Sequence, residues 1–299
     1  MRTFAEFASG LGLQVLHEAL RLHTTFLIGG VADFVAVPQL SLLKKVLAAL
    51  KDLGICYKVV GNGSNLLVCD GPLDMVFVKP TGQAAEIRFV GPGLLHVPAG
   101  VSLRDLCEFA ACHALSGLEF AFGIPGTLGG AIYMNASAYG GQMSDVLQDV
   151  FFLDDRLQER SIAATDAKFD YRDSAFQKTS CCITAATMAL RPEASSVILE
   201  RMQAFWQRRV TRQPLGLPNA GSIFKRPPGF FAAALIEDCG LMGARIGDAA
   251  VSEKHAGFIV NLGKATCADV RQLITKVQGA VWQQKAVKLD LEVEFVPAG

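Results

Sequence analysis

Two glycine-rich segments of this sequence have the residues to hold a ligand through their backbone. Residues 61–65 read Gly-Asn-Gly-Ser-Asn between two apolar runs, and residues 123–136 read Gly-Ile-Pro-Gly-Thr-Leu-Gly-Gly-Ala-Ile-Tyr-Met-Asn-Ala. Glycine has no Cβ, so it adopts positive φ readily and lets a ligand come close to the main chain. Consecutive backbone N–H groups in such turns bind anions such as phosphate, and Ser64 and Asn65 add side-chain donors. Both segments are therefore predicted to line a bound ligand.

Neither segment matches the common nucleotide-binding fingerprints. The chain has no Gly-x-x-x-x-Gly-Lys-Ser/Thr motif, and residues 61–65 lack the third glycine and the helix of the dinucleotide pattern. A P-loop and a Rossmann site are therefore not expected. Taken alone, residues 61–65 also fit a plain tight hairpin, because Asn and Gly tolerate positive φ. The uncharged run between Glu119 and Asp145 contains repeated Gly and a Pro, which favours a loop over a membrane span.

A few polar side chains have the chemistry for proton transfer or charge stabilisation. Ser222 follows Gly221 and also fits a turn serine that bonds its own backbone. Arg172 also fits a surface ion pair, and Glu292 lies in an alternating segment where it shares a face with other charged residues, as on a solvated strand. His255 fits a satisfied core or loop histidine as well as a catalytic base. The residue types alone leave these alternatives open.

Alternating strand and helix patterns are expected to position these residues. Apolar runs and helical spacing predict helices over 41–53, after a cap at Ser102, over 196–209 and after a cap at Thr266. The expected strands cover 32–37, 57–60, 75–78, 85–90, 94–97, 146–154, 181–190 and 287–295. In the last strand, period two places Glu292 on the polar face.

Further motifs occur along the chain around the two glycine segments. They are Thr24-Thr25-Phe26-x-Ile28-Gly29-Gly30, Tyr171-Arg172-x-Ser174-x-Phe176, Gln213-Pro214, Ala220-Gly221-Ser222-Ile223-Phe224-Lys225, Val251-Ser252-x-Lys254-His255-Ala256-Gly257-Phe258-Ile259-Val260-Asn261 and Leu291-Glu292-Val293. In this order they closely resemble the UDP-N-acetylenolpyruvoylglucosamine reductases of bacterial cell-wall synthesis, the MurB family. The resemblance runs nearly end to end, and so many motifs in one order are hard to obtain by chance.

The resemblance implies an α+β fold in which a two-part FAD-binding region of the vanillyl-alcohol-oxidase/PCMH type precedes a C-terminal α+β substrate-binding domain. The expected domains are a first FAD-binding subdomain at 1–80, a second at 81–192 and the substrate-binding domain at 193–299. The last strand, about 286–299, could instead return to the FAD region. The chain lacks the inserted segment that one subgroup uses as a tyrosine-bearing lid, so it resembles the shorter subgroup.

The resemblance also implies an activity. It is the NADPH-dependent, FAD-mediated reduction of UDP-N-acetylglucosamine enolpyruvate to UDP-N-acetylmuramate in peptidoglycan precursor synthesis, with FAD bound non-covalently and NADPH as hydride donor. Ser222 would deliver a proton to the substrate carbon. Arg172 and Glu292 would stabilise the negative charge that develops on the enolate. This activity serves cell-wall biogenesis, and through it cell shape and cell division.

The family motifs also imply which residues bind the ligands. The backbone N–H groups of 62–65 and 126–130 are expected to hold the flavin diphosphate. For the UDP-sugar, Tyr171 and Arg212 are the candidates, with Arg208 and Arg209 as alternatives to Arg212. The residues expected to bind FAD are Gly61, Asn62, Gly63, Ser64, Asn65, Gly123, Ile124, Pro125, Gly126, Thr127, Gly129, Gly130, Asn135 and Ala136.

Three features depart from the family pattern. Leu27 stands where many relatives have a basic or polar residue, and Ser137 replaces a commoner glycine. The chain ends in Pro297-Ala298-Gly299 instead of the usual Val/Ile-Gly ending. These departures concern details of flavin contact.

Two other classes of function remain as alternatives. Another FAD-dependent oxidase or dehydrogenase of the same architecture would keep both glycine segments, but it need not combine them with Ser222, Arg172 and Glu292. Such an oxidase would consume oxygen without an enolpyruvyl substrate. A non-catalytic nucleotide-sugar binding protein would tolerate the loss of the flavin, and the retention of both glycine segments speaks against it.

Composition narrows the partners. The chain has 299 residues, 51% of them hydrophobic, and a formal net charge of zero, without the basic stripe that nucleic-acid binding needs. The eight cysteines include no Cys-x-x-Cys pair, and several lie in apolar runs, which predicts free thiols in a reducing compartment. The N-terminus has no signal-peptide pattern, and no metal-ligand cluster is found. We therefore expect a soluble, cytoplasmic monomer that acts on a small molecule and contacts no nucleic acid or membrane.

Overall fold

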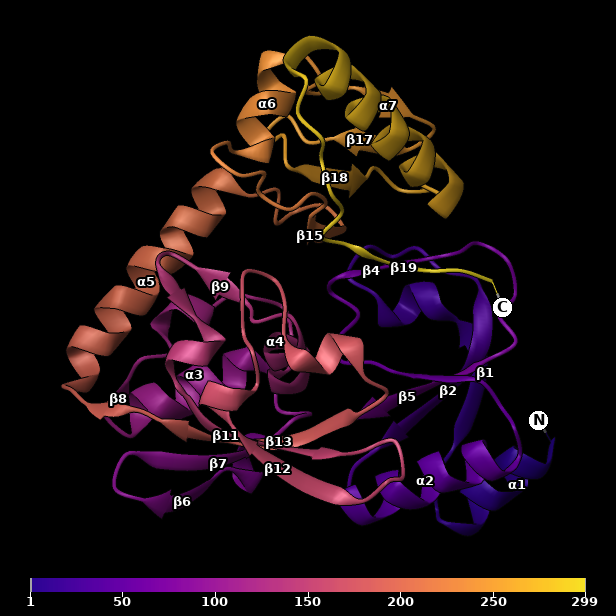
Figure 1. Ribbon diagram of the computed structural model, residues 1–299, viewed down its shortest axis with the longest axis vertical. Coiled ribbons are helices and arrows are strands. Elements are labelled where there is room, and N and C mark those ends of the chain that lie inside the picture. The colour runs from indigo at the N-terminus through magenta and orange to yellow at the C-terminus, as the bar shows by residue number, and fades with distance from the viewer. Residues whose placement is uncertain (1, 299) are drawn as a thin grey trace. The chain divides into compact units, whose positions relative to one another are not determined.

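The structure is a computed structural model that describes residues 2–298 and forms two compact units (Figure 1). One unit comprises the residues up to Leu16, Asp33–Asn62 and Met75–Arg208. The other comprises His17–Ala32, Gly63–Asp74 and the residues from Arg209 onward. Each unit is therefore built from segments that are distant in the sequence. The division into functional domains at residues 80 and 192 stays a prediction, since compactness alone does not define them.

The first sheet is mainly parallel. It has the order β1-β2-β5-β3, in which β2, β5 and β3 run parallel, and its strands are β1 (Val15–Ala19), β2 (Val31–Val37), β5 (Val76–Pro80) and β3 (Tyr57–Val59). Helix α2 (Leu40–Asp52) buries residues at helical spacing, Leu43, Val46, Leu47 and Leu50, and these share one core with valines of β2 and β5 and with Phe4 of α1 (Arg2–Gly10). The predicted helix over 41–53 and the strands around it are confirmed.

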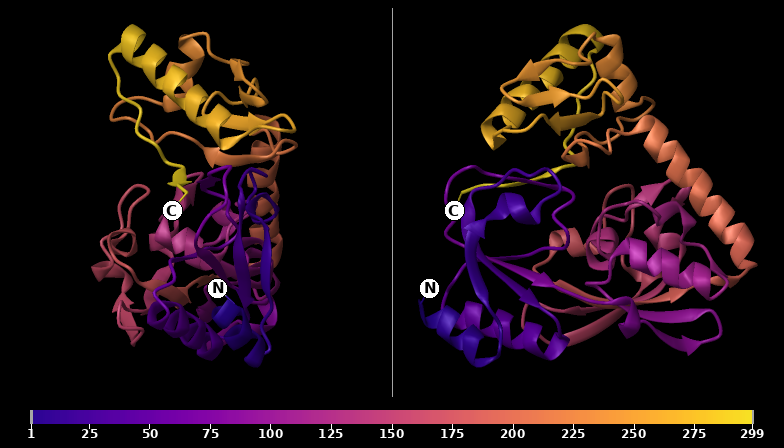
Figure 2. Two further views of the ribbon diagram at one scale, coloured as in Figure 1. Left: turned by 90° about the vertical axis from the view of Figure 1, so that its right-hand side faces the viewer. Right: turned by 180° about the vertical axis from the view of Figure 1, so that it is seen from behind.

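The second sheet is antiparallel and lies in the unit that contains Met75–Arg208. Its order is β12-β11-β13-β7-β6, with strands β12 (Glu159–Ala163), β11 (Leu147–Leu153), β13 (Cys182–Ala189), β7 (Leu94–Pro98) and β6 (Arg88–Gly91). Helices α3 (Leu103–Cys112) and α4 (Leu128–Tyr133) lie on one face of it (Figure 2). Ser102 caps α3 as predicted, because its side chain accepts a hydrogen bond from Asp105 N at 3.0 Å.

The other unit contains a small antiparallel sheet covered by a long helix. The sheet has the order β15-β18-β17-β16, with strands β15 (Asn219–Ser222), β18 (Phe258–Asn261), β17 (Ala249–Val251) and β16 (Arg245–Ile246). Helix α7 (Cys267–Lys285) packs on this sheet beside the short α6 (Ala232–Asp238) (Figure 2). Thr266 caps α7, as predicted, by accepting from Asp269 N at 3.0 Å.

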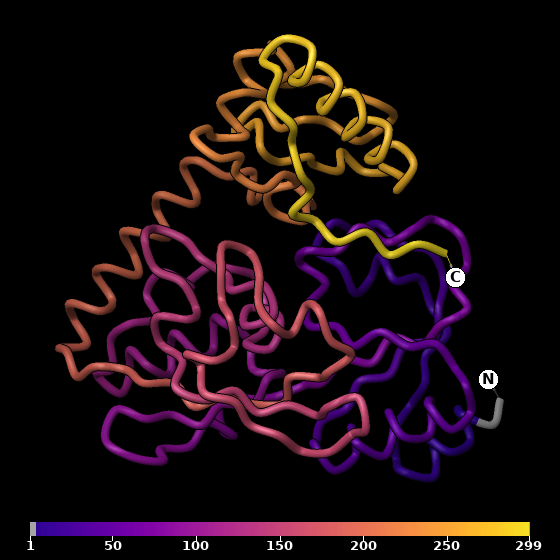
Figure 3. The backbone as a smooth tube through the Cα atoms, in the orientation of Figure 1, coloured from indigo at the N-terminus to yellow at the C-terminus, as the bar shows by residue number. Residues whose placement is uncertain are grey.

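The C-terminal segment is less regular than predicted. A strand was expected over 287–295, but β19 covers only Glu294–Val296, where it pairs in parallel with β4 (Leu66–Val68) (Figure 3). After the left-handed Ala286 (φ 54°), Leu289 and Val293 bury their side chains in the core under α7. Leu291, which a period of two would place on the same face as these two residues, is 39% exposed, so packing against the helix overrides the alternation that the sequence suggested. The expected extent of this strand was wrong.

The remaining elements connect these layers. They include the two-residue strands β8 (Leu115–Ser116), β14 (Arg191–Pro192), β9 (Ser137–Ala138) and β10 (Gly141–Gln142), and the helix α5 (Ser195–Arg212), which was predicted over 196–209. Arg201 of α5 contacts the buried carboxylate of Glu119 at 2.6 Å and that of Glu193 at 2.9 Å. These ion pairs fix the start of α5 to its unit. Within residues 2–298 no helix has the length and apolar character that crossing a membrane requires.

Candidate active site

The two glycine-rich segments meet at Gly61 and Thr127. Gly61 follows β3, and a Cβ on it would lie 2.4 Å from Thr127 Oγ1. Thr127 is 3% exposed and forms the N-cap of α4, where its Oγ1 accepts from Gly130 N at 3.5 Å. The first segment therefore passes directly against the start of the second, and glycine is the residue that fits there.

Part of the second segment is already committed to the protein. Leu128 N donates to Val101 O at 2.9 Å, and Gly129 N donates to Ala99 O at 2.8 Å. A Cβ on Gly129 would lie 2.9 Å from the Cβ of Ala99, so this glycine also allows close packing. These two N–H groups are therefore not available to the flavin diphosphate. Of the expected donors in 126–130, those at the beginning of the range remain candidates. The flavin contact itself stays a prediction.

The other half of the first segment supports a different part of the chain. Gly63 has φ 61°, and a Cβ on it would lie 2.3 Å from His23 O. Asn65 Nδ2 donates to Glu292 O at 3.0 Å, and Glu294 N donates to Asn65 O at 2.9 Å. Asn65 thus holds the backbone that carries Glu292, a role the sequence motif did not indicate.

The structure brings the segments of Ser222 and Glu292 together. Glu292 N donates to Ile223 O at 2.8 Å, so Glu292 lies beside the residue that follows Ser222. Ser222 ends β15 and pairs with Phe258 of β18, and the preceding Gly221 has φ 76°. Both Ser222 and Glu292 are half-buried. A serine hydroxyl and a carboxyl group thereby lie in neighbouring segments of one unit.

His255 supports this arrangement from the next strand connection. Its Nδ1 accepts from Gly257 N at 3.1 Å, and Gly257 O accepts from Ile223 N at 2.9 Å. Burial lowers the pKa of His255, which favours the neutral ring that can accept at Nδ1. These contacts match the satisfied loop histidine that the sequence left as an alternative to a catalytic base.

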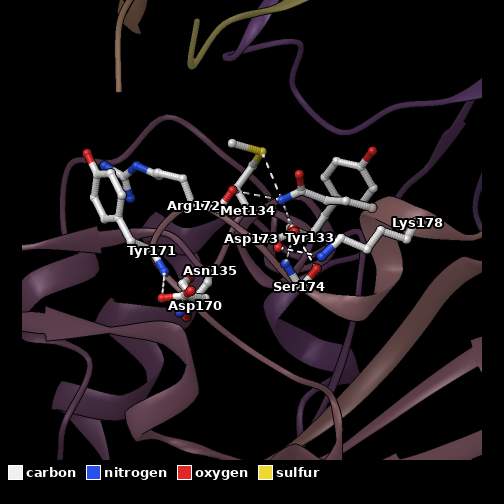
Figure 4. Close-up of polar contacts among 10 residues, drawn as sticks. Tyr133, Met134, Asn135, Asp170, Tyr171, Arg172, Asp173, Ser174 and Lys178 are labelled. Carbon is white, nitrogen blue, oxygen red and sulfur yellow. Dashed lines mark hydrogen bonds and ion pairs between the residues drawn. The ribbon is translucent and has the colours of Figure 1, made fainter. Parts of the chain in front are cut away.

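Arg172 belongs to the other compact unit and occupies the centre of a tight turn (Figure 4). The backbones of Asp170 and Asp173 exchange hydrogen bonds of 3.1 and 3.2 Å, and Arg172 has the left-handed φ of 54°. Its Nη1 donates to Ser137 Oγ at 3.0 Å and its Nη2 to Ser137 O at 3.4 Å. The guanidinium carbon lies 5.6 Å from the ring centre of the exposed Tyr171.

Asn135 connects the second glycine segment to this turn. It is 2% exposed, and its Nδ2 donates to Asp170 O at 3.0 Å (Figure 4). Its Oδ1 accepts from Ser144 N at 3.1 Å. Ser174 Oγ donates to Tyr133 O at 2.7 Å and adds a second connection. The Asn135 side chain is therefore occupied within the protein. A flavin contact from Asn135 and Ala136 stays a prediction.

The three arginines near the end of α5 differ in their surroundings. Arg209 is 6% exposed and its Nη1 donates to Gln213 Oε1 at 3.3 Å, whereas Arg212 is exposed. The guanidinium of Arg208 lies 5.7 Å from the ring centre of Tyr139. A contact between Arg212 and the diphosphate stays a prediction. No group of His, Cys, Asp and Glu side chains that could hold a metal ion occurs within residues 2–298.

Comparisons with known proteins identify the family. A model described as "FAD binding domain" matches residues 33–156, which include both glycine segments, and one described as "UDP-N-acetylenolpyruvoylglucosamine reductase, C-terminal domain" matches residues 213–296. The UDP-N-acetylenolpyruvoylglucosamine reductase of Alkaliphilus oremlandii is 42% identical over 285 residues, covering 95% of this chain and 93% of that protein. The chain belongs to the MurB family.

Solved structures agree with this membership. The MurB crystal structure from Thermus caldophilus has a TM-score of 0.82 and 34% identity, and the match covers 95% of this chain and all of that one (100%). A solvent-stable cholesterol oxidase matches 61% of this chain and 38% of its own at 17% identity and a TM-score of 0.50, which concerns the fold alone. The expected α+β fold with an FAD-binding region of the PCMH type is confirmed.

The MurB residues present here fit an FAD cofactor. At Gly61 and Gly63 a Cβ would meet neighbouring atoms at 2.4 and 2.3 Å, so the main chain follows a path that only glycine allows. The segment also carries the hydroxyl of Ser64, and the second segment adds the backbone of residues 123–127. Main-chain donors and hydroxyl groups suit a diphosphate. FAD is the cofactor of this family member.

Proposed function

We propose that this chain reduces UDP-N-acetylglucosamine enolpyruvate to UDP-N-acetylmuramate, with NADPH as the source of hydride. The observation that carries the proposal is the MurB match over 95% of the chain, because it includes the glycine segments and the motifs of Ser222, Arg172 and Glu292. FAD, when bound, supplies the hydride-transfer chemistry that connects NADPH to the enolpyruvyl group. The reaction belongs to peptidoglycan precursor synthesis.

Ser222 acts as the proton donor in this proposal. Reduction adds a hydride to the methylene carbon of the enolpyruvyl group and a proton to the adjacent carbon, so one proton must be delivered. A serine hydroxyl is a weak acid in water, but an enolate carbon is strongly basic, and a positioned donor suffices. The pairing of β15 with β18 and the left-handed Gly221 support this assignment, because they fix the backbone around Ser222.

Glu292 and Arg172 stabilise the negative charge that develops on the enolate and its carboxylate. Arg172 does so by its fixed positive charge, and Glu292 by a hydrogen bond that requires a shared proton. The bond from Glu292 N to Ile223 O supports a joint role for Glu292 and Ser222. Tyr171 and Arg212 bind the UDP-sugar, with Arg208 and Arg209 as the alternatives to Arg212.

The wider setting of the enzyme is part of the proposal. We assign residues 1–80 and 81–192 to the FAD-binding region and 193–299 to the substrate-binding domain. The pairing of β19 with β4 supports a return of the last strand to the chain that follows the first glycine segment. The enzyme acts as a cytoplasmic monomer on small molecules alone, which its zero formal net charge and its free cysteines support.

Separate measurement of the two half-reactions tests the role of Ser222. In Ser222→Ala, reduction of the bound flavin by NADPH should keep its rate, while reoxidation by the enolpyruvyl substrate should slow by about 100-fold or more, the usual effect of losing a general acid. Ser161→Ala, at an exposed serine of β12, is the matched control and should change neither rate. Equal slowing of both half-reactions by Ser222→Ala would count against a proton donor at this position.

A further inference from the structure

The guanidinium of Arg172 donates to a side chain, that of Ser137, whose role the family motifs do not describe. We infer that Ser137 is a positioning residue that holds Arg172 in the orientation needed to stabilise the enolate. The inference rests on the proposed role of Arg172. Its basis is the pair of contacts from Nη1 to Ser137 Oγ at 3.0 Å and from Nη2 to Ser137 O at 3.4 Å.

The backbone of Arg172 is fixed independently of Ser137. The turn between Asp170 and Asp173 is closed in both directions, and Gln177 Nε2 donates to Arg172 O at 3.0 Å. An arginine side chain still has several rotatable bonds beyond its Cα, and its position is not set by the turn. The contacts at the far end of the side chain are therefore the ones that select where the positive charge lies.

Ser137 is itself held in place. It lies in β9, which pairs with β10 through a two-residue turn at Tyr139 (φ 52°) and Gly140 (φ 88°). The Tyr139 ring stacks on Phe205 of α5 with centroids 4.7 Å apart and planes 6° apart. A Cβ on Gly141 would lie 2.7 Å from the Phe120 ring, so the hairpin is also pressed against the protein below it. The hairpin is therefore held in place by its packing, and Ser137 on it is a well-positioned acceptor for the Arg172 guanidinium.

The chemistry of the acceptor matters as much as its position. A carboxylate at this position would orient the guanidinium but would also neutralise much of its charge. A hydroxyl and a carbonyl oxygen orient it and leave its positive charge available for the substrate. The carbonyl contact exists for any residue at position 137, whereas the hydroxyl contact, which is the shorter one, depends on serine. Substitution by alanine therefore removes the hydroxyl contact and leaves the carbonyl contact.

Half-reaction rates of the holoenzyme test the inference. We expect Ser137→Ala to slow flavin reoxidation by the enolpyruvyl substrate about 10- to 100-fold, the range for a lost hydrogen bond to a charged group. Reduction by NADPH should stay within about twofold of wild type, because Arg172 is not needed there. Ser137→Thr keeps the hydroxyl and should restore reoxidation to within a few-fold of wild type. Ser137→Ala combined with Arg172→Ala should add little to Arg172→Ala alone, since the two residues act as one unit.

A binding measurement gives a second readout that does not depend on turnover. UDP-N-acetylmuramate carries a carboxylate that UDP-N-acetylglucosamine lacks. By calorimetry on the oxidised holoenzyme, Ser137→Ala should weaken binding of the first ligand several-fold and leave the second unchanged. Equal weakening of both ligands would indicate a general structural defect and would overturn the inference.

The outcomes separate this inference from the proposed role of Arg172. Normal reoxidation in Arg172→Ala would refute the role of Arg172 itself. Slow reoxidation in Arg172→Ala together with normal reoxidation in Ser137→Ala would leave that role intact and refute positioning by Ser137. If Ser137→Ala does not retain flavin, Ser137→Gly takes its place, and a normal rate in that variant has the same meaning.

Discussion

Substitution of Gly61 by alanine tests how closely the two glycine segments must approach each other. The new Cβ would lie 2.4 Å from Thr127 Oγ1, against 3.4–4 Å for ordinary contact. Thr127 cannot easily turn away, because it is 3% exposed and its Oγ1 caps α4 at Gly130 N. Overpacking of this kind costs about 1–3 kcal/mol. Where the FAD-bound state bears this free-energy cost, FAD affinity should fall about 5- to 150-fold.

Titration of the apoprotein with FAD, followed by flavin fluorescence, measures this loss. Gly71→Ala is the matched control in the same region of the sequence, since a Cβ there meets nothing within 4 Å, and it should bind FAD as wild type does. Thr127→Ala removes the clashing oxygen but also the cap, which costs about 0.5–2 kcal/mol. The double variant Gly61→Ala with Thr127→Ala should therefore bind FAD more tightly than Gly61→Ala alone. Wild-type affinity in Gly61→Ala, or no recovery in the double variant, would refute the reasoning.

Two titratable side chains give predictions for pH dependence. Burial raises the pKa of Cys182 to about 12 from an ordinary value of about 8.5, so its contribution to stability is present below pH ~8.5 and is lost as pH rises toward 12. The decline of Tm above pH ~8.5 should be shallower in Cys182→Ala than in wild type, and parallel curves would contradict this. Burial lowers the pKa of His255, so its contribution is present above pH ~6.5 and is lost as pH falls below that value. His255→Asn keeps an acceptor for Gly257 N, so at pH 8 its Tm should be closer to that of wild type than the Tm of His255→Leu is. Below pH 6.5 the Tm of His255→Asn should fall less than that of wild type. Equal losses of Tm in the two variants at pH 8 would argue against the acceptor role.

Local signals in the sequence predicted local structure well. The caps at Ser102 and Thr266 are confirmed, because a capping side chain and its backbone donor lie three residues apart. The apolar spacing of α7 is likewise confirmed by its buried residues. Each of these features is set by residues within a few turns of one another. Helix caps and apolar spacing can therefore be predicted from the sequence alone.

Long-range contacts could not be predicted in the same way. The bond between Arg172 and Ser137 joins residues 35 apart, and that between Asn65 and Glu292 joins residues 227 apart. Nothing in the residue types selects these partners. The sequence placed Ser137 only as a departure from a glycine, while the structure gives its hydroxyl a partner. The candidate site residues came from the family motifs, whereas their supporting contacts became visible only in the fold.

The C-terminal segment shows the same limit for secondary structure. Its alternation of apolar and charged residues predicted a strand over 287–295, yet Leu289 and Val293 pack into the core under α7 instead. Gln278 Nε2 of α7 donates to Leu289 O at 2.8 Å. This side chain therefore occupies a backbone carbonyl that would accept from a neighbouring strand in a sheet. The alternation of apolar and charged residues could not indicate whether a second strand pairs with this segment, and a strand forms only where such a partner is present.

The most direct test of the central claim is an anaerobic titration of the purified protein followed by visible absorbance. The account predicts a non-covalent flavin band that bleaches with NADPH and returns when UDP-N-acetylglucosamine enolpyruvate is added, with UDP-N-acetylmuramate as the product. Under the same conditions, UDP-N-acetylglucosamine should leave the flavin bleached. A protein that gains no band with FAD, or a bleached flavin that the enolpyruvyl substrate does not reoxidise, would contradict the account.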